Sequence, residues 1–113
     1  MVKRKFSRKT GERRAFMKGL MHNLIVHGSM ATTVERAKSV RIAIEKLVTV
    51  AKKQDVAHLR LLIARLPHKV SAEKLYYEIA PRYKDRLGGY TRIIKQGLTR
   101  KRDGAATALI EFV

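Results

Sequence analysis

The sequence has no cysteine and no tryptophan among its 113 residues, and it has only two prolines. The absence of cysteine excludes a disulfide scaffold, a thiolate metal site and a cysteine nucleophile. No apolar run approaches the ~20 residues that a membrane-spanning helix needs. The opening Met-Val-Lys-Arg-Lys is unlike a secretory signal, which needs an apolar stretch behind its charges. We therefore expect a soluble protein with no membrane partner and no signal segment.

Acidic residues are the other scarcity. Nine Asp and Glu stand against 26 Lys and Arg, which gives a formal net charge of +17. The excess is clustered: residues 1–18 and residues 82–102 each carry eight cations and one anion, and the rest of the chain contributes only +3. Two such surfaces in so short a chain indicate contact with a polyanion, because binding phosphates relieves self-repulsion and releases condensed cations.

The size and composition predict one folded domain. The length is below the ~150 residues of a common domain, and the hydrophobic fraction of 45% is close to the roughly 45–50% of globular chains. Residues 1–9 hold five cations and little apolar surface, too little to offset chain entropy. The expected organisation is a basic N-terminal tail at 1–9 and a single globular domain at 10–113.

Helical periodicity governs the first half of the domain. A helix is predicted from Thr10, its N-cap, to a stop at Gly28, because apolar residues recur at i, i+3, i+4, i+7 and i+8. These are Met17, Leu20, Met21, Leu24 and Ile25. Thr32 and Glu35 fit a capping box, which opens a second helix to about Lys53. Its buried stripe is predicted to be Ala37, Val40, Ile44, Leu47, Val48 and Ala51. Five cations lie off that stripe, free for solvent or phosphate: Arg36, Lys38, Arg41, Lys46 and Lys52.

Two shorter helices are predicted next. Gln54 and Asp55 break the second helix and cap a third, which Pro67 ends. Its expected buried face is Val56, Leu59, Ile63 and Leu66. A fourth begins at Ser71 and stops before Pro81. Its hydrophobic staple would be formed by Val70 and Leu75.

The last part of the chain has strand character. Residues 90–97 and 105–113 are predicted to form a hairpin around a basic turn at 98–104, and residues 30–33 are a candidate third strand. The second hairpin strand is expected to point Ala106, Ala108, Ile110 and Phe112 inward, and Thr107 and Glu111 outward. The predicted fold class is α+β, with about four helices packed on a small sheet that contains the C-terminal hairpin, and with a basic N-terminal extension.

The sequence offers little for catalysis. There is no Walker-type loop and no GxGxxG, and the serines have no recognisable base partner. The histidines lack the spacing of paired metal ligands: they are His22, His27, His58 and His68. We predict no enzyme activity, no cofactor, no metal and no small-molecule substrate.

The segment from Arg82 to Arg92 combines four cations, two tyrosines and a glycine pair. Glycines let backbone amides approach an anion, arginine can fork onto phosphate, and tyrosine can stack on a base. The alternative is that Tyr83 and Tyr90 fill the core between helices and sheet while the glycines form a turn. Both roles remain open at this point.

These same residues carry a family resemblance. The stretch 81–93, PRYKDRLGGYTRI, resembles the signature of the bacterial-type large-subunit ribosomal protein seventeen family. The similarity extends over nearly the whole chain, through Arg8-Lys9, Asn23-Leu24, Thr32-Thr33, residues 36–38, residues 45–52, Lys95, the turn at 102–105 and residues 108–111. The chain departs from the family's usual pattern at Lys3, near Arg13 and at Thr107.

The resemblance implies a structural constituent of the large ribosomal subunit, in a bacterial cytoplasm, which binds ribosomal RNA near the polypeptide exit side and has ribosomal protein thirty-two as a neighbour. The alternative is a basic DNA-binding or nucleoid-type protein, although no helix has a clear recognition pattern. The residues predicted to contact RNA are Lys3, Arg4, Lys5, Arg8, Lys9, Arg13, Arg14, Lys18, Arg36, Lys38, Arg82, Tyr83, Lys84, Arg86, Gly88, Gly89, Tyr90, Arg92, Lys95, Arg100, Lys101 and Arg102.

Overall fold

The structure, a computed structural model, describes residues 10–99 and 104–113. In chain order its elements are α1 (Thr10–His27), β1 (Ser29–Thr33), α2 (Val34–Ala51), α3 (Val56–Arg65), α4 (Lys69–Lys74), β2 (Thr91–Thr99) and β3 (Ala106–Phe112). After α4 the helical backbone continues through a π-helical segment, η1 (Leu75–Ile79), and a 3-10 helical segment, η2 (Ala80–Tyr83). The α+β class with four helices is confirmed. The predicted tail at 1–9 lies outside the described residues.

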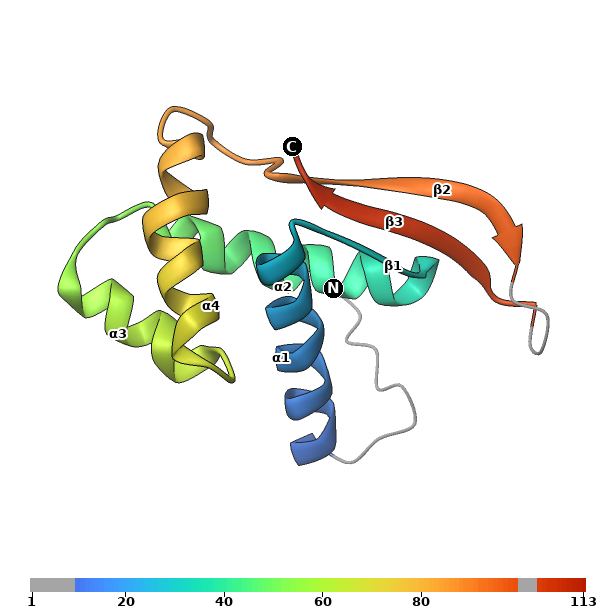
Figure 1. Cartoon of the computed structure of the whole chain (residues 1–113), viewed down its shortest axis with the longest axis horizontal. Coiled ribbons are helices and arrows are strands. Elements are labelled where there is room, and N and C mark those ends of the chain that lie inside the picture. Colours follow the sequence, from blue (N-terminus) through green and yellow to red (C-terminus); the bar gives the residue numbers. More distant parts are fainter. Residues whose placement is uncertain (1–9, 100–103) are drawn as a thin grey trace.

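The three strands form one antiparallel sheet in the order β1-β3-β2. β3 pairs with β1 from Ser29 opposite Glu111, and with β2 from Thr91 opposite Phe112. The predicted hairpin and the third strand are therefore confirmed. Helix α2 packs against all three strands, and the far end of the hairpin extends beyond it (Figure 1).

The inward side of β3 follows the prediction except at its first residue. Ala108 and Ile110 are fully buried, and Phe112 packs at the edge of the core. Ala106 is exposed instead. It pairs with Thr99, beyond the register shift that lies between Lys95 and Thr99, in the part of the hairpin that projects past α2 (Figure 1).

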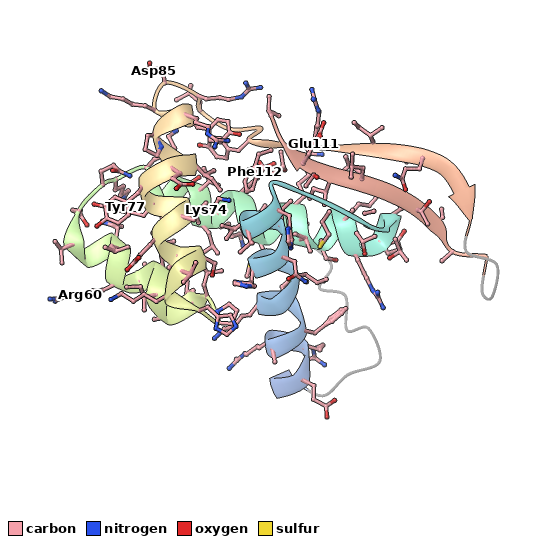
Figure 2. The ribbon with its side chains drawn as sticks, in the orientation of Figure 1. Arg60, Lys74, Tyr77, Asp85, Glu111 and Phe112 are labelled. Atoms are coloured by element: carbon pink, nitrogen blue, oxygen red, sulfur yellow. The ribbon has the colours of Figure 1, made fainter. Side chains whose placement is uncertain are left out.

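The core joins α1, α2 and the sheet. Leu24 and Ile25 from α1 are fully buried against the α2 stripe, every predicted member of which is buried. Gly28 ends α1 with a φ of 79°, which glycine adopts without strain, and its amide bonds to the carbonyl of Leu24 at 2.8 Å. From the other side, Lys74 of α4 donates to the carbonyl of Val26 at 2.8 Å, which ties α4 to the end of α1 (Figure 2).

The start of α2 differs from the predicted capping box by one residue. Thr33, not Thr32, is the N-cap, and its hydroxyl accepts the amide of Arg36 at 3.3 Å. Thr32 is still in the strand, where it pairs with Ala108. The residue three positions after Thr33 is an arginine, which has no carboxylate to return the bond, so the predicted box is wrong.

Helix α3 is capped as predicted, and three of the four residues predicted for its buried face pack inward. Asp55 accepts the amide of His58 at 2.8 Å, and this bond is the main reason the pKa of Asp55 is lowered. Val56, which was expected in the core, is 63% exposed, whereas Leu62 is fully buried. The face that packs inward holds Leu59, Leu62, Ile63 and Leu66.

The fourth helix starts earlier and runs further than predicted. It begins at Lys69, and Val70 is 68% exposed, so no staple with Leu75 forms. Ser71 is buried within the helix, and its hydroxyl donates to the carbonyl of His68 at 2.8 Å. The helical backbone also continues past Pro81. That residue stands in the first turn of η2, a position that tolerates proline although it has no backbone N–H.

Candidate nucleic-acid interface

Most of the predicted cations within the described part of the chain lie at the surface. On α1, Arg14 is exposed while Arg13 and Lys18 are half-buried. On α2, Lys38 is exposed, and the guanidinium of Arg36 lies 5.0 Å from the centre of the Phe16 ring. The predicted cations that fall outside the described residues are Lys3, Arg4, Lys5, Arg8, Lys9, Arg100, Lys101 and Arg102.

The segment 82–90, here called the cationic loop, comprises the last two residues of η2 and the connection from η2 to β2. Arg82, Lys84 and Arg86 are all exposed there, with Asp85 as the one acidic residue among them. The loop lies at the upper edge of the molecule in Figure 2, where Asp85 is labelled. Three cations within five residues can meet a run of phosphates without a large rearrangement of the chain.

Two tyrosines and the last residue hold the base of the cationic loop. The hydroxyl of Tyr83 donates to the carbonyl oxygen of Val113 at 2.7 Å, and the amide of Val113 donates to the carbonyl of Tyr90 at 2.9 Å. Within the loop, the amide of Arg86 donates to the carbonyl of Tyr83 at 2.9 Å. The two ends of the loop are therefore also joined through Val113, the residue that follows β3.

Tyr83 and Tyr90 fill the core, as one of the two sequence alternatives predicted. They are 3% and 2% exposed, and their ring centres are 5.3 Å apart. Burial raises the pKa of Tyr83 above its ordinary value. Neither ring offers a face for a base in this conformation, so the structure does not support the predicted RNA contact of these two side chains.

Lys52 fixes the middle of the cationic loop from the C-terminal end of α2. Its ammonium donates to the carbonyl of Arg86 and, at 3.0 Å, to the hydroxyl of Tyr90, and it lies 5.0 Å from the centre of that ring. The hydroxyl of Tyr90 in turn donates to the carbonyl of Arg86 at 3.3 Å. The bond from Lys52 is the largest cause of the lowered pKa of Tyr90. The prediction that Lys52 is free for phosphate is wrong: its ammonium is used inside the protein.

A matched pair of neighbours tests this anchoring role. We expect Lys52→Met to lower the free energy of unfolding by about 1.5–3 kcal/mol, the usual contribution of a hydrogen bond to a charged group, and to speed amide hydrogen exchange in the cationic loop. Lys53→Met removes the same charge from an exposed position and should change stability by less than about 0.5 kcal/mol. Equal effects of the two variants would show that only the charge matters.

The cations of β2 are partly neutralised within the sheet. Arg92 stands directly opposite Glu111, and its Nε donates to the carboxylate at 2.6 Å. Its side chain remains 60% exposed, so it can still reach a phosphate. Lys95 is exposed further along the strand. The ion pair between Arg92 and Glu111 lies at the surface and contributes little to stability.

Nothing in the described part of the chain gathers three or more side chains that could hold a metal ion. The rings of His22 and His68 do meet, with centres 4.7 Å apart, a contact that the sequence spacing did not reveal. Burial, with the neighbouring imidazoles second, lowers the pKa of His22. None of the described helices is both long and apolar enough to span a bilayer.

Comparisons with known proteins agree with the resemblance seen in the sequence. Residues 16–113 match the family model of ribosomal protein L17. The large ribosomal subunit protein bL17 of Persephonella marina is 50% identical over 109 residues, which covers 96% of this chain and 88% of that protein. The bL17 of Dictyoglomus turgidum is 48% identical over 110 residues, covering 97% and 94%.

The bL17 of Bdellovibrio bacteriovorus is also similar, at 48% identity over 108 residues. That match covers 96% of this chain but only 59% of the Bdellovibrio protein. The relatives therefore differ in length, although each of these three matches covers at least 96% of this chain.

Proposed function

Because this chain belongs to the ribosomal protein L17 family, we propose that it is a structural constituent of the bacterial large ribosomal subunit, in the cytoplasm. It binds and stabilises ribosomal RNA through phosphate contacts near the polypeptide exit side. Its role is neutralisation and packing of RNA rather than catalysis, and it needs no cofactor. Ribosomal protein thirty-two is the proposed protein neighbour.

The proposal that this chain binds RNA is supported chiefly by the cationic loop, whose backbone is held by hydrogen bonds. Arg82, Lys84 and Arg86 are exposed, while the backbone that carries them is held by Lys52, Tyr90 and Val113. An interface whose backbone is already ordered loses less conformational entropy on binding. RNA helices are bound chiefly through backbone and shape, and this arrangement suits that mode.

The remaining cations extend the same proposal over other parts of the chain. Arg14 and Lys38 are exposed on α1 and α2, and Arg92 and Lys95 are exposed on the hairpin. The cations of 1–9 and 100–102 are included from the sequence alone. Together they supply enough positive charge for several separate phosphate contacts.

Sedimentation with large subunits tests the proposal. We expect the purified protein to sediment with bacterial large subunits at about 0.1 M salt and to leave them near 1 M, because phosphate contacts weaken as cations compete. A competing large-subunit ribosomal RNA should displace the protein from a labelled RNA far better than duplex DNA of equal length. Equal displacement by the two nucleic acids would favour the DNA-binding alternative, and no binding to RNA in dilute buffer would refute the proposal.

A further inference from the structure

Resting on the proposed RNA-binding function, we infer that Leu87 makes an apolar contact with an unstacked base of the ribosomal RNA. The inference gives the cationic loop a second role besides phosphate neutralisation. It rests on the exposure of Leu87, on the rigidity of the backbone beneath it, on the charges around it and on the glycine that follows it.

Leu87 is completely exposed, at 100%. The next most exposed large hydrophobic side chain in the described part of the chain is Val70, at 68%. Single exposed leucines are common on protein surfaces, but this one stands on a backbone that is fixed at the preceding residue. The carbonyl of Arg86 accepts bonds from both Lys52 and Tyr90, so the loop presents Leu87 instead of folding it back onto the core.

The surrounding charges indicate what kind of surface Leu87 meets. Arg82, Lys84 and Arg86 precede it and are exposed, so a partner that covers the leucine must also accept three cations. A protein pocket that is apolar at its centre and strongly acidic at its rim would be needed to do both. RNA does both in one molecule, because loops and bulges splay out bases with apolar faces between phosphates.

Gly88 adds an independent observation. The following glycine, Gly89, has a φ of 63° and so needs to be glycine. Gly88 has no such angle, and a Cβ built on it would meet nothing within 4 Å. The carbonyl of Gly88 accepts the Nε of Arg86 at 3.2 Å, a bond that any residue at this position could make, so the described contacts give no steric reason for glycine at 88. Its bare backbone beside Leu87 leaves room for a close approach from outside, which a base lying on the leucine would use.

The test compares Leu87→Ala with Val70→Ala for binding to large-subunit ribosomal RNA of Dictyoglomus turgidum transcribed in vitro. We expect Leu87→Ala to raise Kd about tenfold, a size consistent with losing part of a leucine side chain's burial. The slope of log affinity against log salt should stay the same, because no phosphate contact is lost. Val70→Ala should bind as the wild type does. Neither exposed residue supports the core, so the unfolding transition should not move.

Gly88→Ala provides a second variant that cannot fail through misfolding. The free structure has space for the methyl group, so stability should be unchanged or slightly raised, while RNA affinity should fall severalfold. The inference is overturned if both variants bind the RNA as the wild type does. It is equally overturned if Leu87→Ala flattens the salt slope, or if it weakens binding to whole large subunits but not to the naked RNA. Failure of the wild type to bind the RNA at all would instead remove the proposed function.

Discussion

Leu62→Ala is expected to lower the free energy of unfolding by about 3 kcal/mol, a typical cost for truncating a fully buried leucine. Leu62 is 0% exposed and sits on the face of α3 that packs against α2 and α4. For a chain of this length the same loss corresponds to a fall of roughly 10–15 °C in Tm. Urea unfolding followed by circular dichroism measures the first quantity, and calorimetry measures the second.

The control is Val56→Ala at the start of the same helix. Val56 is 63% exposed, so its truncation should change the free energy of unfolding by less than about 0.5 kcal/mol. The buried face predicted from the sequence implies the opposite order of effects, because it places Val56 in the core and does not include Leu62. A larger loss from Val56→Ala than from Leu62→Ala would restore that face and contradict the orientation of α3 described above.

The buried face of α3 was predicted correctly at three positions, but Val56 was wrongly included and Leu62 was missed. The ten residues of this helix, Val56–Arg65, hold apolar side chains on nearly every side, so more than one stripe satisfies a 3.6-residue repeat. The choice between them depends on where α2 and α4 lie, and that depends on contacts distant in sequence. In α2, by contrast, cations separate the apolar positions, so the stripe from Ala37 to Ala51 was predicted without error.

Local chemistry was predictable and long-range hydrogen bonding was not. Asp55 begins α3 and Gly28 ends α1, each through a hydrogen bond to a residue within four positions, and both were identified from the sequence. The capping threonine was missed by one position because two threonines stand side by side. Lys52 was misassigned because its partners, Arg86 and Tyr90, lie 34 and 38 residues away, and no local pattern indicates such a pairing.

Neutralising the cationic loop should weaken binding to ribosomal RNA about 100-fold near 0.15 M salt. The variant is Arg82→Gln with Lys84→Gln and Arg86→Gln, which removes three exposed cations and leaves Asp85 in place. If each contacts one phosphate, the slope of log affinity against log salt should become shallower by about 2–3. Stability should change little, because the bonds from Lys52 and Tyr90 use the backbone carbonyl of Arg86. The variant removes one exposed side-chain bond within the loop, from Nε of Arg86 to the carbonyl of Gly88 at 3.2 Å, and an exposed bond contributes little.

A second triple variant distinguishes RNA binding through local contacts of the cationic loop from long-range attraction to the net charge of the protein. Arg60→Gln with Arg65→Gln and Lys69→Gln removes the same charge from exposed positions on α3 and α4, and Figure 2 places Arg60 well away from Asp85 in the cationic loop. Long-range attraction responds to net charge and is screened over about 10 Å at 0.1 M salt, so it would weaken equally in both variants. Phosphate contacts are local, so we expect the helical variant to lose less than about fivefold in affinity with a nearly unchanged slope. Equal losses would mean that the chain binds RNA through its total charge, and the order that Lys52 imposes on the cationic loop would then serve the fold alone.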